Sequence, residues 1–399
     1  MITTEAKIVK LILAALALPF VVLMRILSPF VIVRICILDL GRIGAVLPHF
    51  DMYISSRDAG QEGHRNFDIY CFNQGKIANY QIKRMVERAI PICPFAFWID
   101  KVNKRIPGWE KHVVMGRSRF YYDFIDKALP NLRFTEKELQ YGQEELQKLG
   151  VPRNNPYICF HARDDSYLKI HQPQINWDYH SYRNADIDNY VLAVEKLVSK
   201  GYFAIRMGRF VAKKIKTDNP KIIDYAAKGG TDFLDMYLSA YCRFFIAGSD
   251  GLAEIPTIFR RPVIWIDFIP FSAVHLVARG QLFIPKKLWS LKEKRFLTFD
   301  EMFNTEVAKY GRTEYYQKAG IEVINNSPEE ILDVAMEMEE RLNGAWDETE
   351  EDEDLQQRFR RIVGGDGRKF FGLIGATFLK QHKELLGLSC RPESMMSPK

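Results

Sequence analysis

The sequence predicts an α/β protein with two Rossmann-like domains that face each other across a cleft, preceded by an N-terminal apolar helix. Short apolar, β-branched runs alternate with segments of helical spacing, an order typical of parallel sheets. Glycine-bearing turns follow two of these runs, at residues 39–44 and 248–251. The chain has 399 residues, which is too long for one compact core and fits two domains plus extensions.

Composition narrows the class of protein. A hydrophobic content of 47% excludes general disorder. The net charge of +6 comes without a dominant lysine or arginine tract, which favours anionic small molecules or a membrane surface as partners. The sequence has no helix-turn-helix pattern and no strand of interleaved aromatic and basic residues, so we expect no nucleic-acid partner.

The six cysteines are scattered singly through apolar surroundings, at positions 36, 71, 93, 159, 242 and 390. None belongs to a CxxC pair or to a spacing typical of metal ligands. We expect buried, reduced thiols in a cytoplasmic protein, and no structural metal.

The segment Ile8–Met24 is almost wholly apolar, with Lys7 and Lys10 at its start and Arg25 after it. Its length is at the short limit for a bilayer span, and it lacks the small-residue cleavage site of a secretory signal. We predict a membrane-associated helix at residues 1–30, which either spans the inner membrane or lies on its cytoplasmic face. The alternative is a helix packed on the protein's own core.

The first domain is predicted to span residues 31–150. Val31–Leu38 reads as its first strand, and the turn after it contains Gly41, Arg42 and Gly44. This turn lacks the full GxGxxG pattern, so dinucleotide binding is not supported. His49 lies just beyond this turn. The candidate catalytic base is His49 or an aspartate near residue 164, such as Asp165, and the alternative for His49 is an ordinary surface histidine.

Later segments complete this domain. Asp68–Phe72 is the next predicted strand, followed by a helix through Lys83–Ala89. Phe134–Leu149 has helical spacing and stops at Gly150. The proline-bounded residues 151–156 then form a natural domain boundary.

The second domain, residues 151–345, is predicted to bind a nucleotide. Its first strand, Tyr157–Phe160, leads directly into His161, Arg163 and Asp165. An arginine suits a diphosphate because its planar guanidinium holds two oxygens and stays charged. The alternative is a local ion pair between Arg163 and a neighbouring aspartate.

Two further loops are expected at the same edge of the sheet. Arg183 lies in a polar loop before a predicted helix, where it faces the crevice or caps that helix. The predicted strand Tyr202–Arg206 ends at Met207 and Gly208, so Arg206 and Gly208 are candidate lining residues.

Phe244–Asp267 contains the most informative turn. An apolar strand ends in Gly248, Ser249, Asp250 and Gly251, a segment of helical spacing follows, and Val263–Ile266 is the next strand. The turn and the helix N-terminus would aim backbone N–H groups at a phosphate, while Glu254 accepts hydrogen bonds from a ribose. The alternative is an ordinary turn in which glycine relieves strain and Glu254 complements the helix dipole.

The remaining segments have weaker patterns. Leu288–Lys309 has helical spacing only in part, whereas Pro328–Leu342 reads as an amphipathic helix. Residues 346–399 are predicted to comprise an acidic linker, DETEEDED, and a closing helix over Phe370–Leu388.

Several motifs in a fixed order resemble a family of bacterial glycosyltransferases of surface-polysaccharide synthesis. They are CFHARDD, SYRNADIDNY, GYFAIRMG, TDFLDMYLSAYCRFFIAGSDGL with IFRRPV, and GLIGATFLKQHKELL. The resemblance implies a GT-B architecture, in which the C-terminal domain, residues 151–345, holds the nucleotide sugar. The N-terminal domain, residues 31–150, would bind the acceptor, which would enter past the loop of Gly41, Arg42 and Gly44. It also implies that protein cations, and no bound metal or cofactor, neutralise the diphosphate.

A looser resemblance is to fucosyltransferases that use a guanosine-diphosphate sugar and carry an HxRxxD loop. His161 and Arg163 match the first two positions, and Ser166 replaces the expected aspartate. The departure puts both fucose and guanine in doubt.

These observations predict a metal-independent glycosyltransferase acting on a glycan or lipid-linked acceptor. A nucleotide-sugar epimerase of similar build is one alternative. A non-catalytic scaffold in a polysaccharide assembly is the other.

Overall fold

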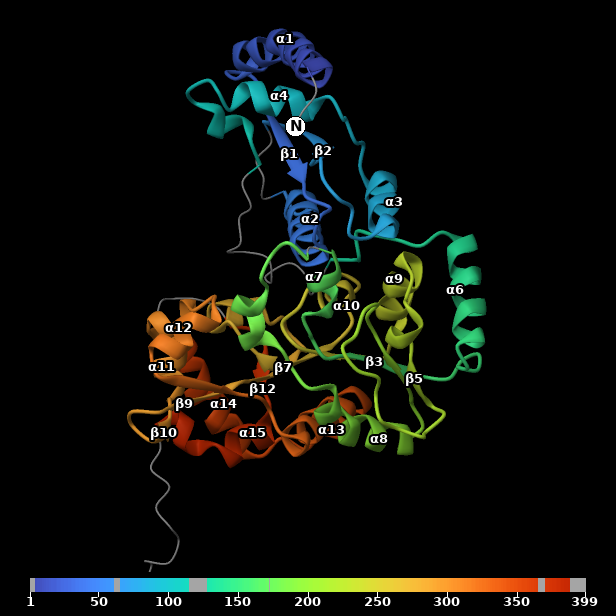
Figure 1. The fold of residues 1–399 in the computed structure, drawn as a ribbon, viewed down its shortest axis with the longest axis vertical. Helices are drawn as coiled ribbons and strands as arrows, with labels where there is room; N and C mark the ends of the chain where they lie inside the picture. The colour runs from blue at the N-terminus through green and yellow to red at the C-terminus, as the bar shows by residue number, and fades with distance from the viewer. Residues whose placement is uncertain (1–3, 61–64, 115–127, 172, 365–369, 388–399) are drawn as a thin grey trace, which may run out of the picture. The chain divides into compact units, whose positions relative to one another are not determined.

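The computed structural model describes residues 4–60, 65–114, 128–171, 173–364 and 370–387. The chain divides into two compact units, unit 1 with residues 1–136 and 258–260, and unit 2 with the rest (Figure 1). The division falls after Glu136 and not at Gly150 as predicted. The reason is that α6 (Glu136–Lys148) packs on α9 (Asp232–Tyr241), with the rings of Tyr141 and Phe233 4.9 Å apart.

Unit 1 contains a parallel pair of strands with helices. Its elements are α1 (Thr4–Leu27), β1 (Ile32–Leu38), α2 (Ile43–Asp58), β2 (Asn66–Phe72), α3 (Tyr80–Ala89), α4 (Ala96–Asn103) and the 3-10 helix η1 (Trp109–His112). β1 and β2 pair along their whole length, and single bridges add Val113 beside β1 and Ile92 beside β2. Among the described residues this sheet has two strands, so the predicted full Rossmann-like sheet is wrong for this part. That two domains face each other across a cleft stays a prediction.

Unit 2 is organised around a seven-stranded sheet with the order β12-β8-β7-β6-β3-β4-β5. Its strands are β3 (Tyr157–His161), β4 (Phe203–Arg206), β5 (Ile222–Asp224), β6 (Phe245–Ala247), β7 (Val263–Phe268), β8 (Leu282–Pro285) and β12 (Leu373–Ile374). All neighbouring strands are parallel. From β3 the chain builds outward to β5 and then returns to the other side of β3. This switch point between β3 and β6 is where open α/β sheets place their ligands.

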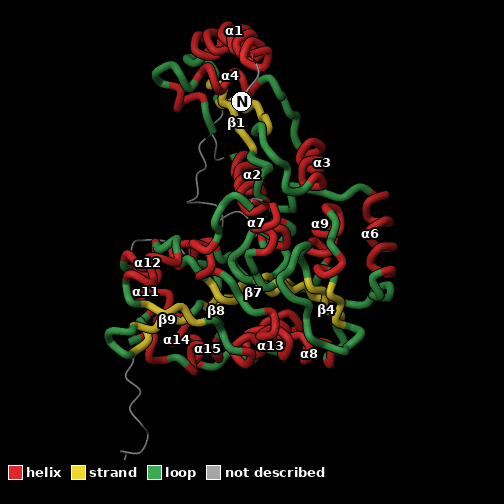
Figure 2. The backbone as a smooth tube through the Cα atoms, in the orientation of Figure 1, coloured by secondary structure: helices red, strands yellow, loops and turns green. Residues whose placement is uncertain are grey.

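Helices cover both faces of this sheet, as Figures 1 and 2 show. α8 (Val191–Ser199), α13 (Pro328–Asn343) and α15 (Ala376–Gln381) lie on one side, and α9 and α10 (Glu254–Ile258) lie on the other. Burial on both faces explains why β7 consists of six buried residues, with no alternation of polar side chains. The other helices are α7 (Ser166–His171), η2 (Asp178–Arg183), η3 (Ile187–Tyr190), η4 (Ala226–Lys228), η5 (Phe271–Leu276), α11 (Phe299–Asn304), η6 (Glu306–Lys309), α12 (Thr313–Lys318), α14 (Glu350–Val363) and η7 (Lys383–Leu386).

A small antiparallel sheet in unit 2 was not predicted. β9 (Lys287–Ser290) pairs with β10 (Arg295–Phe296) on one side and with β11 (Ile321–Ile324) on the other. The partial helical spacing from Leu288 onward did not reveal β9 and β10. These strands are too short to show the two-residue alternation of polar and apolar side chains that indicates a strand.

The C-terminal segment also differs from its prediction. The acidic run begins α14, where Thr349 and Asp352 form a capping box. The closing helix predicted over Phe370–Leu388 is confirmed only over α15 and η7, because β12 adds a strand to the main sheet before them. Gly372 permits this close approach, since a Cβ there would lie 2.4 Å from Cγ1 of Val277. Leu388 lies outside the described residues.

The described cysteines are free thiols. Four are buried as predicted, whereas Cys93 is exposed because it lies in the loop between α3 and α4. Cys390 lies outside the described residues.

Candidate functional site

His161 ends β3 at the switch point of the sheet. Its Nδ1 donates a hydrogen bond to the carbonyl oxygen of Met207 at 2.9 Å, which holds the proton on Nδ1 and turns Nε2 toward Asp250, 3.7 Å away. Gly208 has a φ of 125°, and a Cβ on it would lie 3.4 Å from the His161 ring. The loops after β3, β4 and β6 therefore meet at this histidine.

Arg163 follows in the same loop and is buried. Its Nη1 donates to Oδ1 of Asn184 and, at 3.4 Å, to the carbonyl oxygen of His180. Burial lowers the pKa of Arg163 to about 10, and the charge of Arg183 contributes to this decrease.

Arg183 is the last residue of η2 and lies against the glycine-serine turn. Its Nη2 donates to the carbonyl oxygen of Ser249. Its Nε is buried and has no hydrogen-bond partner among the described residues. The guanidinium is thus fixed at one end and has a free donor at the other.

Lys286 immediately follows β8 and is only 1% exposed. Its Nζ donates to the carbonyl oxygen of Asn184 and to Oδ1 of Asn325, both at 2.7 Å. Burial lowers the pKa of Lys286 to about 8. Asp267 opposes the decrease, and the charges of Arg163 and Arg183 add to it.

Together, Arg163, Arg183 and Lys286 form a cationic cluster. Within the described ranges none of the three has a carboxylate at ion-pair distance, and they donate hydrogen bonds to carbonyl and amide oxygens. Like charges brought together away from water repel one another, and an anion relieves that repulsion. The cluster is therefore suited to a diphosphate.

Asp250 lies close enough to Arg163, and Asp267 close enough to Lys286, to affect the pKa of each cation, and Glu254 lies near Asp250. Asp250 has a buried Oδ2 with no hydrogen-bond partner in the described parts of the chain, and the same is true of Asp267. Burial raises the pKa of Asp267 to about 6. Burial, together with the charge of Asp250, raises the pKa of Glu254 to about 8, so at neutral pH this half-buried carboxyl holds its proton. A protonated carboxyl can donate a hydrogen bond to a ribose as well as accept one.

The turn at Gly248–Gly251 differs from its prediction. α10 has five residues and begins only at Glu254, because Oδ1 of Asp250 accepts hydrogen bonds from the amides of Leu252 and Ala253. These amides are not free to bind a phosphate, and so short a helix offers no useful dipole. The Ser249 hydroxyl accepts a hydrogen bond from the amide of Ile269 at 3.3 Å, which ties the turn to the end of β7.

Arg206 does not line the crevice as predicted. It is buried, and its Nη1 donates to the carbonyl oxygen of Lys213 and to Asp224. It therefore stabilises β4, β5 and the loop between them. The sequence could not distinguish this structural role from a ligand-binding role, because an arginine at the end of a strand has the same sequence pattern in either role.

The aspartates after Arg163 have local partners. Asp165 pairs with Lys169 at 2.6 Å on α7, and Asp164 accepts the amides of Ser166 and Ala212. Asp165 is thereby engaged as the partner of a lysine, which weakens its candidacy as a base.

The remaining predicted residues belong to unit 1. Gly41 donates its amide to Asp39 at 3.0 Å, Arg42 precedes α2, and Gly44 lies in the first turn of that helix. His49 is exposed on α2. Whether these residues meet an acceptor stays a prediction.

Lys286 and Asn184 were missed by the sequence reasoning. Lys286 could have been found, because it directly follows an apolar, strand-like run, and parallel strands end at one edge. Asn184 carried no comparable signal. Its backbone carbonyl accepts a hydrogen bond from Lys286, and its side chain accepts one from Arg163. Both contacts depend on the tertiary structure.

No model of a protein family matches the chain, and no curated protein sequence matches it. Among solved structures, it is similar to a family 9 glycosyltransferase of Veillonella parvula, with 10% identity, a TM-score of 0.37, and coverage of 59% of this chain and 80% of that one. It is similar to ADP-heptose lipopolysaccharide heptosyltransferase II of E. coli, with 13% identity, a TM-score of 0.35, and coverage of 58% and 84%.

It is also similar to the iron-containing dodecameric glycosyltransferase TibC of E. coli, with 14% identity, a TM-score of 0.31, and coverage of 59% and 61%. These identities and TM-scores are too low to establish a common activity. In the described part of this chain, no group of three or more His, Cys, Asp or Glu side chains could hold a metal ion.

Proposed function

We propose that this protein is a glycosyltransferase that takes a sugar from a nucleotide-diphosphate donor and passes it to a cell-surface glycan or lipid-linked acceptor. The observation that carries the proposal is the cationic cluster of Arg163, Arg183 and Lys286 at the switch point of a parallel sheet. In a structural ion-pair network the cations would have carboxylate partners, and in the described residues these three have none at ion-pair distance. The cluster is therefore better suited to binding a doubly anionic ligand.

In the proposed reaction the three cations bind the diphosphate. The bond between the anomeric carbon and the diphosphate oxygen breaks, and its electron pair leaves with the nucleoside diphosphate, whose growing charge the cations stabilise. The acceptor hydroxyl oxygen forms the new bond to the anomeric carbon, and its proton passes to a base. His49 of unit 1 is the proposed base, and Glu254 is proposed to contact the ribose. We propose that no metal takes part and that the reaction occurs at the cytoplasmic face of the membrane.

A donor screen tests this function. The purified full chain is incubated with adenosine-, guanosine-, uridine- and cytidine-based sugar donors, and the products are separated by ion-pair chromatography. A transferase releases nucleoside diphosphate and, without acceptor, slowly frees the sugar. An epimerised sugar nucleotide, recovered intact, would establish the epimerase in its place.

A matched pair of variants tests the scaffold alternative. Arg163→Ala removes a member of the cationic cluster, and Arg153→Ala removes an exposed arginine elsewhere in unit 2. Donor turnover should fall at least about tenfold in the first variant only, since a charge-assisted contact contributes about 1.5–3 kcal/mol. Unchanged turnover or glycan output in Arg163→Ala would favour a scaffold.

A further inference from the structure

The helix α1 presents an apolar surface that the described residues of unit 1 leave exposed. It is long and apolar enough to cross a membrane by composition, yet little of it is buried. Leu11 is 72% exposed, Ile26 is 65% exposed, and Phe30 just after the helix is 80% exposed. An exposed apolar surface of this extent marks an interaction site.

One narrow stripe of α1 is packed on its own unit. Ala17, Val21 and Met24 are buried in a cluster that includes residues of α4, and the rings of Phe20 and Phe95 lie 5.6 Å apart. Figure 1 shows α1 lying across α4. The packed stripe spans the middle and the C-terminal half of the helix, which fixes its direction relative to α4.

Polar contacts fix the C-terminal end of α1. Arg25 donates hydrogen bonds to the carbonyl oxygen of Pro107 and to Oδ1 of Asn103, both at 2.8 Å. The loop at residue 107 and the end of α4 are therefore bound to the last turn of α1.

This packing is incompatible with a transmembrane orientation. A helix of 24 residues is about 36 Å long and would need most of that length to cross a hydrocarbon core of about 30 Å. Ala17 would then lie deep in the bilayer. Because α4 packs on this part of α1, the Asp100–Lys104 ion pair of α4, 2.9 Å long, would also lie in the hydrocarbon. Charged groups and open loops of this kind are costly in hydrocarbon.

The charges beside α1 are mostly positive. Lys7 and Lys10 are exposed on the helix itself. On α4, Lys101 is exposed, and its Nζ lies 4.5 Å from the ring centroid of Phe97 and 5.3 Å from that of Trp98. Lysines beside aromatic rings at the edge of an apolar surface are typical of the boundary between lipid headgroups and acyl chains.

We propose that α1 and Phe30 lie in the plane of an anionic lipid bilayer, with the exposed apolar face in the headgroup and acyl boundary and the packed stripe against α4. The helix is an interfacial anchor and not a span. Its lysines attract anionic headgroups, and its apolar side chains provide the burial that holds the protein there. This inference does not depend on the proposed glycosyl transfer.

Vesicle flotation with the purified full chain tests the proposal. We expect the protein to float with vesicles of phosphatidylglycerol and phosphatidylcholine, and at least about tenfold less with pure phosphatidylcholine, because each lysine near an anionic surface contributes about 1 kcal/mol. The double variant Leu11→Asp/Leu16→Asp should abolish flotation. Leu291→Asp, which alters a leucine of unit 2 that is 50% exposed, should float like the wild type.

Three results would overturn the proposal. One is protein that stays in cell membranes after alkaline carbonate extraction, since that is the behaviour of a spanning helix. Another is a stable dimer, without affinity for vesicles, that Leu11→Asp/Leu16→Asp converts to a monomer, since a second copy would then cover the face. The third is equal flotation of the double variant and the wild type. Circular dichroism of the double variant checks that it is folded.

Discussion

Lys286 is the residue whose charge state is most sensitive to ligand binding. Its amino group is buried between amide oxygens and near two guanidinium groups, and its pKa is lowered to about 8. A bound diphosphate would favour the charged form and raise this pKa. Binding is therefore linked to the uptake of a proton whenever the pH exceeds about 8.

This linkage predicts a pH dependence of donor affinity. Below about pH 8 Lys286 is already charged, so affinity should change little. Above it, affinity should fall by up to about tenfold per pH unit, because binding then requires protonation of one group. Isothermal titration calorimetry of a nucleoside diphosphate between pH 6.5 and 9.5, in buffers of different ionisation enthalpy, measures both effects.

Lys286→Met provides the control for this titration. It should bind more weakly at pH 7 and lose the decline in affinity above about pH 8. A decline of the same size in the variant would assign the titration to another group.

At the scale of single helices, the contact between α6 and α9 depends on one glycine. A Cβ on Gly142 would lie 2.2 Å from the ring of Tyr237, which is itself held between Phe233 and Tyr241 at centroid distances of 5.7 and 4.9 Å. The ring cannot move freely, so the helices can approach only without a side chain at this position.

Gly142→Ala should therefore destabilise the protein, although alanine is the better helix former. We expect an overpacking cost of about 1–3 kcal/mol, offset in part by about 1 kcal/mol of helix propensity. Urea unfolding followed by circular dichroism measures the difference. Gln147→Ala, at an exposed position of the same helix, should be neutral or slightly stabilising. A stabilised Gly142→Ala would show that α6 does not pack on α9 as described.

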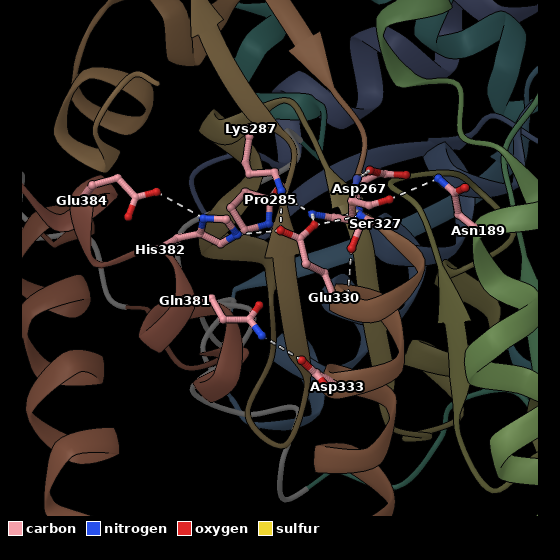
Figure 3. Close-up of polar contacts among 11 residues, drawn as sticks. Asn189, Asp267, Pro285, Lys287, Ser327, Glu330, Asp333, Gln381, His382 and Glu384 are labelled. Atoms are coloured by element: carbon pink, nitrogen blue, oxygen red, sulfur yellow. Dashed lines mark hydrogen bonds and ion pairs between the residues drawn. The ribbon is translucent and has the colours of Figure 1, made fainter. Parts of the chain in front are cut away.

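The helix α13 holds the C-terminal segment through Glu330, shown with its partners in Figure 3. Glu330 accepts hydrogen bonds from Lys287 and from Nε2 of His382, the latter at 2.6 Å. Burial alone would raise the pKa of Glu330, but these two donors and the amide of Ser327 outweigh it and lower the pKa to about 2.

Glu330→Gln should cost about 3–5 kcal/mol of unfolding free energy, because it leaves two buried donors without their charged partner. The contribution of Glu330 is fully present above its ordinary pKa of about 4.5 and is lost as the pH falls toward about 2. Urea unfolding at pH 7 and pH 4 should therefore show a smaller difference between wild type and variant at the lower pH. Glu322→Gln, on β11, should be nearly neutral at both. An equal loss at both pH values would contradict this role.

At the scale of the whole molecule, the strands of the main sheet were largely predictable from the sequence. β3 and β4 lie within about a residue of their predicted bounds, because buried parallel strands are continuous apolar runs. The strands that were missed, β8 to β12, are short, and β11 and β12 pair with strands far away in the chain.

The candidate site was predictable at its strand ends only. His161, Arg163 and the turn after β6 could be placed at one edge because parallel strands end together. The partner of Arg206 and the role of Asn184 depend on which side chains meet in three dimensions, and residue spacing in the sequence does not show that. The backbone amides after Asp250 were expected to be free to bind a phosphate. Instead, the Asp250 carboxylate accepts hydrogen bonds from them.

The central claim is that the cationic cluster of unit 2 binds a diphosphate, and calorimetry of the full chain tests it most directly. A nucleoside diphosphate should bind at least about tenfold more tightly than the matching nucleoside, and Arg183→Gln should remove that difference while Arg153→Gln keeps it. Equal affinities for nucleoside and nucleoside diphosphate, or an Arg183→Gln variant that binds the diphosphate as the wild type does, would contradict the claim.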